Sequence, residues 1–237
     1  TGRLLGTYSA YTMPMMRIQK YMSQEGMCSR REAEYFISRG LVKLNGKVVT
    51  EMGIQIDPAK DKVELLRQKA LSNKQTLAFH KPRGMTTEEI TSFKPEFKIL
   101  SPVGRLDKES EGLILLTNDG LVTKSVTSDK HLVEKEYEVT VQEDINPGKM
   151  RKMEAGIRLE DGMTMPAKAE RLSAHSFSLI IKEGRKHQIR RMCDAVHLTV
   201  VQLKRGRIGN ITLKGIPEAD FRVLSAKEVE TLRNSAR

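Results

Sequence analysis

A polar segment at residues 67–75 divides this 237-residue chain into two parts with different hydrophobic patterns. The segment is rich in Lys and Gln and has little periodicity, which is typical of a linker. The part before it is short enough to be marginal as an independent fold, whereas the part after it is long enough to bury a large core. We therefore expect a small domain at 15–66, a linker at 67–75 and a larger domain at 76–237.

The small domain has the pattern of two helices followed by a β-hairpin. Apolar residues recur at helical spacing within 17–25, and a second helical pattern ends at Gly40. Asn45-Gly46 then separates two short apolar runs, which is a strong signal for a tight hairpin. A third strand is expected at 63–66.

The larger domain is dominated by strand patterns, with helices interspersed without strict alternation. Strands are expected at 77–80, 113–116, 137–141, 177–181 and 200–204. Helices are expected at 121–127, 147–155, 187–196 and after a capping box at Ser225 and Glu228. This order predicts an α+β domain with a mixed or antiparallel sheet.

The formal net charge of +11 favours a polyanionic partner. Residues 182–207 alone hold eight Lys or Arg against two acidic residues. No apolar run approaches the ~18 residues of a membrane-spanning helix, so no membrane partner is expected. Cys28 and Cys193 lack the spacing of metal ligands, which favours buried, reduced thiols in the cytoplasm. No signal-peptide core precedes the three methionines at 13–16, one of which we expect to be the natural start.

Asp107 is the strongest candidate for a reacting side chain. It precedes an apolar run, and a carboxylate held in a dry pocket by its neighbours acts as a nucleophile or a base. Arg105 shares its face in an extended segment and is one candidate neighbour. The alternative is a surface ion pair without chemistry. Phosphate-binding glycine motifs are missing from the sequence, and the five histidines lack ligand spacing, so neither a nucleotide cofactor nor a metal is expected.

The basic segment 183–192 is the second candidate for the site. On a helix, Lys186 and Arg190 would share one face, and His187 and Arg191 would share another. One face would then enter a site while the other meets phosphates; the alternative is a solvated basic surface.

Four motifs occur in the order found in RNA pseudouridine synthases. They are HKPRGM at 80–85, GRLDKESEGLILLTNDG at 104–120, KEYEV at 135–139 and EGRKHQIRRM at 183–192. The preceding CSRREAEYFISRGLVKLNGK at 28–47 resembles the S-four-type RNA-binding module. Together the motifs cover roughly residues 15–230 and resemble the group that contains RsuA, RluB, RluE and RluF. The match is best to its RluF branch, which acts on 23S rRNA.

The resemblance implies an isomerase that detaches uracil from its ribose, turns it and rejoins it through carbon, without a cofactor. Asp107 would attack or deprotonate the ribose, and Tyr137 would stack on the base and assist proton removal. Arg190 would pair with Asp107 and hold it ionised. Arg105 would fill the gap left by the flipped nucleotide, and Ile189 would form the pocket wall.

The remaining basic residues are candidates for RNA phosphate contacts. They are Arg17, Lys20, Arg30, Arg31, Lys43, Lys81, Arg83, Lys186, Arg191, Lys204, Arg205 and Arg207. The expected partner is ribosomal RNA, with the large subunit favoured and tRNA as an alternative, and the protein is expected to be a monomer.

Two other functions fit the sequence. A non-catalytic rRNA-binding or ribosome-assembly factor would also use the basic segment, but it leaves the carboxylate, tyrosine and arginine set unexplained. An RNA N-glycosylase would want a positioned water, often with a second carboxylate to activate it. Glu109 and Glu111 are the nearest carboxylates, and we expect both to be exposed loop residues. The sequence identifies neither the modified uridine nor the assembly state of the RNA.

Overall fold

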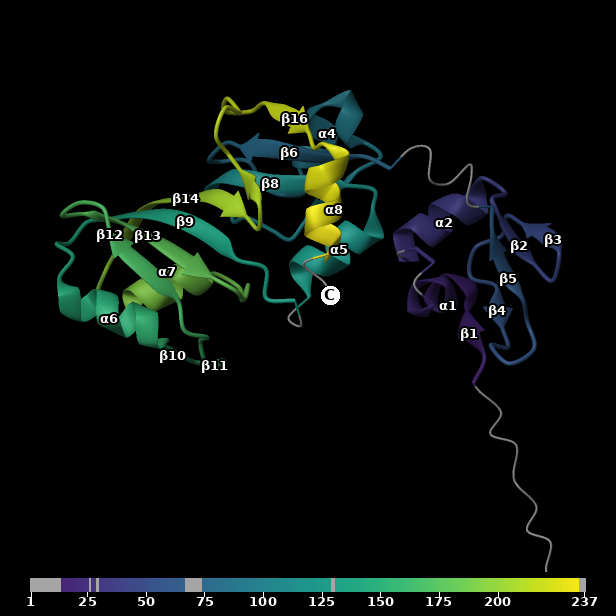
Figure 1. The fold of residues 1–237 in the computed structure, drawn as a ribbon, viewed down its shortest axis with the longest axis horizontal. Helices are drawn as coiled ribbons and strands as arrows, with labels where there is room; N and C mark the ends of the chain where they lie inside the picture. Colours follow the sequence, from purple (N-terminus) through teal and green to yellow (C-terminus); the bar gives the residue numbers. More distant parts are fainter. Residues whose placement is uncertain (1–13, 26, 29, 67–73, 129–130, 235–237) are drawn as a thin grey trace, which may run out of the picture. The chain divides into compact units, whose positions relative to one another are not determined.

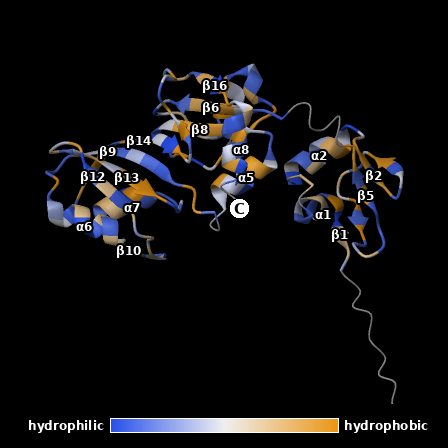
Figure 2. Ribbon diagram, in the orientation of Figure 1, coloured by the Kyte–Doolittle hydropathy of each residue, from blue (hydrophilic) through white to orange (hydrophobic). Residues whose placement is uncertain are grey.

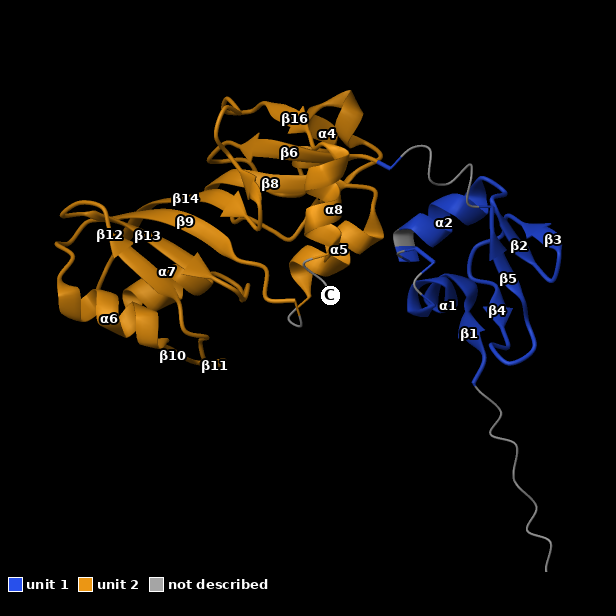
Figure 3. Cartoon of the chain, in the orientation of Figure 1, with its two compact units in different colours: residues 1–74 blue, residues 75–237 orange. Residues whose placement is uncertain are grey.

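The computed structural model describes residues 14–25, 27–28, 30–66, 74–128 and 131–234. The chain forms two compact units, Thr1–Lys74 and Gln75–Arg237 (Figure 3). Of the expected linker, residues 67–73 lie outside the described part.

The first unit contains the predicted helices and hairpin (Figure 1). Its elements are β1 (Met16–Arg17), α1 (Ile18–Gln24), α2 (Arg30–Ser38), β2 (Val42–Leu44), β3 (Lys47–Val49), β4 (Gln55–Ile56) and β5 (Val63–Leu65). Strands β3, β2 and β5 form an antiparallel sheet, and Asn45 and Gly46 turn between β2 and β3 with positive φ values of 51° and 81°. The short pair β1 and β4 was not predicted. Burial of residues such as Ile18, Phe36 and Ile37 gives the unit its own core.

The second unit is built on one long sheet. Its strands are β6 (Thr76–Lys81), β7 (Ser101–Val103), β8 (Glu111–Thr117), β9 (Lys135–Val141), β12 (Lys168–Arg171), β13 (Ser176–Ile181), β14 (Val200–Ile208), β15 (Ile211–Thr212) and β16 (Phe221–Val223). The order is β12-β13-β9-β14-β8-β6-β16, with β7 on β8 and β15 on β14. The β14–β8 pair is parallel and the other pairs are antiparallel, so the predicted mixed sheet is confirmed.

Helices and a small hairpin complete this unit. They are α4 (Ile90–Phe93), the 3-10 helix η1 (Pro95–Phe97), α5 (Gly120–Thr127), α6 (Pro147–Ala155), the hairpin β10 (Arg158–Leu159) and β11 (Gly162–Met163), α7 (Gln188–Asp194) and α8 (Ala226–Asn234). Helix α8 begins with the predicted capping box, in which Ser225 and Glu228 exchange hydrogen bonds. In the described part of the chain, none of the helices has the length and hydropathy to span a membrane.

Strand β8 is an interior strand of the sheet and is buried on both faces. Ile114 and Leu116 belong to one apolar cluster, which includes residues of α6 and α7, whereas Leu113 and Leu115 belong to a second cluster, which includes residues of α5 and α8. This explains the continuous apolar run, which Figure 2 shows as an orange band at β8. Strand β8 begins four residues after Asp107, so the core fixes one end of the loop that carries the carboxylate.

Candidate active site

The loop that carries Asp107 is held by the turn after β6. Thr87 Oγ1 donates a hydrogen bond of 2.9 Å to the Leu106 carbonyl, and the Gly84 amide donates one of 2.8 Å to the Lys108 carbonyl. The Ser110 amide closes the loop on the Asp107 carbonyl at 3.0 Å. The two sequence motifs at 80–85 and 104–120 therefore form one structural unit around the carboxylate.

Asp107 lies on the wall of a cavity of about 420 Å³ within the second unit. Tyr137 from β9, Ile189 from α7 and Arg205 from β14 line the same cavity and are all buried. Arg105 also lines it but is exposed. The structure thus brings Asp107 and Arg105 together with Tyr137 and Ile189, which lie far from them in sequence.

Arg190 does not contact Asp107 as we expected from the resemblance. Its guanidinium donates to the Glu109 carbonyl at 3.1 Å and to the Val200 carbonyl at 3.5 Å. The side chain that faces Asp107 is His187, whose Nε2 lies 3.3 Å from Asp107 Oδ1. Arg190 thus braces the loop around Asp107 through its backbone.

The start of α7 explains this difference. The helix begins at Gln188, and His187 precedes it with a left-handed φ of 50°. Lys186 and His187 therefore do not continue the helical faces of Arg190 and Arg191 that the sequence pattern predicted. The backbone turn at His187 directs its ring toward the carboxylate, a placement that helical spacing could not reveal.

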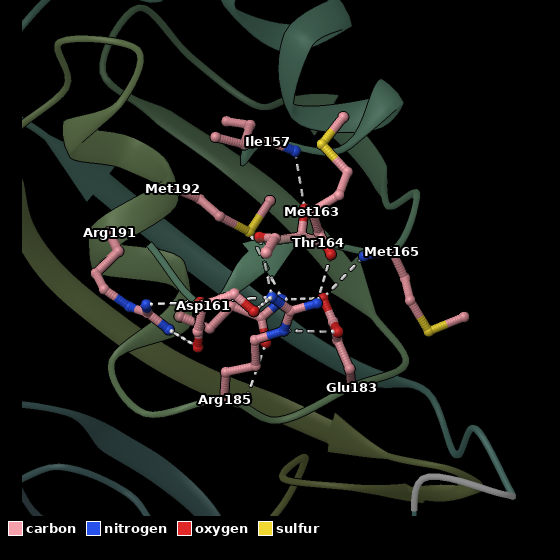
Figure 4. Close-up of polar contacts among 11 residues, drawn as sticks. Ile157, Asp161, Met163, Thr164, Met165, Glu183, Arg185, Arg191 and Met192 are labelled. Atoms are coloured by element: carbon pink, nitrogen blue, oxygen red, sulfur yellow. Dashed lines mark hydrogen bonds and ion pairs between the residues drawn. The ribbon is translucent and has the colours of Figure 1, made fainter. Parts of the chain in front are cut away.

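A network around Asp161 holds the segment before α7 against the hairpin β10–β11 (Figure 4). Arg191 makes a two-pronged ion pair with Asp161 at 2.9 and 3.0 Å. Arg185 donates to Glu183 at 3.0 Å, to Asp161 at 3.4 Å, and to hairpin carbonyls that include that of Met163. Arg191 bonding to Asp161 raises the pKa of the arginine and lowers that of the carboxyl. Arg191, which we expected to meet phosphate, is thus engaged within the protein.

Burial places two of the predicted RNA-contacting residues away from the outer surface. Lys81 is fully buried and donates to the carbonyls of Pro82 and Met85 at 2.9 and 2.7 Å. Desolvation lowers its pKa to about 8. Arg205 is 3 % exposed and contributes to the cavity wall instead of the outer surface. The signal was in the strand period: Arg205 shares its face with buried Leu203, and Lys81 ends a fully buried strand.

The other predicted RNA contacts vary in exposure. Arg17, Lys20, Arg30, Arg83 and Lys186 are exposed, and Lys43, Lys204 and Arg207 are half-buried. Arg83 pairs with Glu109, and Arg207 pairs with Glu134 and Glu136. The side chain of Arg31 lies outside the described residues.

Comparisons with known proteins agree with this division of the chain. The model of the RNA pseudouridylate synthase family matches residues 75–195, and that of the S4 domain matches residues 16–61. The ribosomal large subunit pseudouridine synthase B of Bacillus subtilis is 37% identical, with 92% of this chain and 96% of that protein covered. The dual-specificity RNA pseudouridine synthase RluF of Escherichia coli is also 37% identical, with 90% and 77% covered. A crystal structure of a pseudouridylate synthase superposes with a TM-score of 0.69 at 32% identity, covering 92% of this chain and 99% of that one.

Proposed function

We propose, since this chain belongs to the RNA pseudouridylate synthase family, that it isomerises uridine to pseudouridine in ribosomal RNA. The substrate is 23S rRNA, in keeping with the similarity to a large subunit enzyme and to RluF. The enzyme acts as a cytoplasmic monomer without a cofactor. Residues 15–66 dock on structured RNA, and residues 76–237 carry out the chemistry.

The observation that carries this proposal is that Asp107 and Tyr137 line the same cavity. Asp107 is half-buried and acts on the ribose, by bonding to its anomeric carbon or by removing a ribose proton. Tyr137 is buried on a central strand, so its ring offers a fixed surface on which the flipped uracil stacks. The buried residues of the cavity wall limit the access of water to the detached base.

Three further residues assist in different ways. Ile189 packs as an apolar wall below the base, because it is buried in the same core as Tyr137. Arg105 is exposed on the cavity lining, where it fills the gap that the flipped nucleotide leaves in the RNA. Arg190 is a positioning residue that braces the Glu109 carbonyl two residues beyond Asp107.

The test is pseudouridine mapping of total RNA from cells that lack this gene, by carbodiimide labelling and primer extension. We expect one lost site in 23S rRNA that is restored by the wild type and not by Asp107→Asn. A site restored by both would show that the carboxylate is not required. No lost site in any RNA would favour a non-catalytic assembly factor, and release of free uracil would indicate an N-glycosylase.

Docking by the first unit has its own test. Lys20 and Arg30 are exposed, and we propose that each neutralises one phosphate. The logarithm of the RNA-binding constant falls as the logarithm of the salt concentration rises. In the double variant Lys20→Gln with Arg30→Gln, this negative slope should become shallower by about 2. The exposed acidic residue Glu51 of the same unit provides a control, since Glu51→Gln should not make this slope shallower. An unchanged slope for the double variant would remove these residues from the RNA-binding surface.

A further inference from the structure

Arg205 is a buried cation whose surroundings leave part of its hydrogen-bonding capacity unused. Its Nε donates to the Leu113 carbonyl at 2.7 Å, and its Nη1 donates to Tyr137 Oη at 3.4 Å. Its Nη2 is buried and has no acceptor among the described residues. No carboxylate in the described part of the chain forms an ion pair with it. Buried charges without such compensation are costly, so a retained one indicates a role.

The neighbouring arginine on the same strand shows the ordinary solution. Arg207 lies two residues further along β14, and its guanidinium pairs with Glu136 at 2.7 Å and Glu134 at 3.3 Å. It is half-buried and its charge is neutralised within the protein. Strand β14 therefore carries one compensated arginine and one, Arg205, that faces the cavity uncompensated.

The strand pairing holds Arg205 close to the proposed reacting groups. It stands directly opposite Tyr137 in the β14–β9 register, with its guanidinium carbon 5.9 Å from the centre of the tyrosine ring. On its other side it pairs with Gly112, where an added Cβ would come within 2.4 Å of the Arg205 carbonyl oxygen. Glycine at this position allows the close approach of β14 to the strand that follows Asp107.

Other cations on the cavity lining cannot replace Arg205. Arg105, Lys108, Lys182 and Lys186 are exposed, and Arg185 is engaged with Glu183 and Asp161. Lys135 is half-buried and donates to the Val133 carbonyl at 3.2 Å. Among the described cations that line the cavity, Arg205 alone is buried, where low polarity strengthens its electrostatic field. The cavity wall holds a second buried polar atom without a described partner, Ser110 Oγ, which also indicates that a polar ligand completes this site.

We propose that Arg205 is a catalytic residue that stabilises the negative charge of the detached uracil. This rests on the proposed function. When the bond between N1 and the ribose C1′ breaks, its electron pair leaves with the base, and the charge spreads over N1, O2 and O4. The base turns, a bond forms between C5 and C1′, and the proton lost from C5 is matched by one taken up at N1, so no atom is gained or lost. Asp107 contributes negative charge to the same cavity, and the guanidinium of Arg205, with its free Nη2, offsets the repulsion between this charge and the uracil anion.

The experiment compares single-turnover rates of wild type, Arg205→Met, Arg205→Lys and the control Arg171→Met on a target-site RNA. Arg171 is exposed on β12 and loses the same charge on substitution, so its rate should stay within about 2-fold of wild type. Arg205→Met should be slower by about 100-fold with RNA affinity unchanged. Arg205→Lys keeps the charge and should lose only about 10-fold, and it serves as the test variant should Arg205→Met not fold.

A second substrate separates charge stabilisation from a structural role. RNA with 5-fluorouridine at the target position has a more stable departing anion, and fluorine at C5 blocks the final proton loss, so disappearance of 5-fluorouridine reports detachment. On this RNA, the factor by which each Arg205 variant is slower than wild type should be about 10-fold smaller than on the uridine RNA. An equal deficit on both RNAs, or no deficit on uridine, would overturn the inference. Failure of the proposed function would look different, because the wild type itself would then convert no uridine.

Discussion

The arginines around Asp161 and the arginine at the cavity, all in the second unit, have opposite electrostatic environments. Around Asp161, the guanidinium groups of Arg185 and Arg191 contact carboxylates and backbone carbonyls, and the whole network joins the hairpin β10–β11 to the segment before α7. At the cavity, Arg205 keeps a buried donor without an acceptor beside Tyr137. The contacts around Asp161 stabilise the folded protein. At the cavity, the positive charge and the unpaired donor of Arg205 remain available to a negatively charged substrate. Within the basic segment 182–207, the partners of each arginine thus distinguish a structural role from a chemical one.

The largest difference should appear when Asp107 is replaced by asparagine. This carboxylate contacts His187 and is half-buried, so its loss should change Tm by less than about 2 °C. The single-turnover rate should fall by about 10⁴-fold or more, because the reacting group is removed. Rate measurements at saturating enzyme, with thermal unfolding as the folding control, would check this. A fall of less than about 10-fold would contradict the role of Asp107.

Asp161→Asn is the matched substitution in the network around Asp161. In contrast to Asp107→Asn, it should affect stability more than the reaction rate. It removes the acceptor of the Arg191 ion pair and weakens the hold on Arg185, so Tm should fall while the rate drops by less than about 10-fold. Because the pKa of Asp161 is lowered in the folded protein, its contribution is present above the ordinary carboxyl pKa and is lost as the pH falls below it. Thermal unfolding of both proteins at pH 7 and pH 3 tests this, and a constant difference would contradict it.

Lys81 is a buried cation that is hydrogen-bonded yet still strained by desolvation. Its folded pKa of about 8 lies below the ordinary 10.5, so the folded protein bears a penalty below pH 8 that is relieved as the pH rises toward 10.5. The free energy of unfolding of wild type relative to Lys81→Met should therefore increase by about 2 kcal/mol between pH 7.5 and pH 10. Urea titrations at four pH values would measure it. The exposed Lys98→Met provides the control, and a flat difference for Lys81 would refute the assignment.

The sequence predicted the elements whose signals are local. The Asn45-Gly46 hairpin and the Ser225–Glu228 capping box were found because turn and cap chemistry act within a few residues. The two-residue strands β1 and β4 were missed, since pairs of that length have no periodicity to detect. The hairpin β10–β11 was missed for the same reason, although it anchors the network around Asp161.

For the site, the sequence predicts which residues lie near one another better than it predicts their contacts. Motif resemblance selected Asp107 and Tyr137, and the structure places both on one cavity. The partner of Asp107 was predicted wrongly, because the choice between Arg190 and His187 depends on one left-handed backbone turn before α7. The net charge of the segment predicts an RNA contact for Arg205 without its location, whereas the alternation along the strand places this residue on the buried face with Leu203.

The smallest effect that we predict concerns a fully compensated pair far from the cavity lining. Arg222 donates to both carboxylate oxygens of Glu228 at 3.1 and 2.7 Å, and this contact lowers the pKa of Glu228 to about 2. A depressed carboxyl pKa gives stability that is present above the unfolded value of 4.5 and is lost as the pH falls toward 2.

Since the pair is partly exposed, Glu228→Gln should cost about 1 kcal/mol at pH 7. Glu230→Gln on the exposed face of α8 is the control. Urea unfolding at pH 7, 4 and 3 should show the Glu228→Gln deficit shrinking as the pH falls, and a deficit of the same size at all three pH values would assign it to lost helix capping instead of charge.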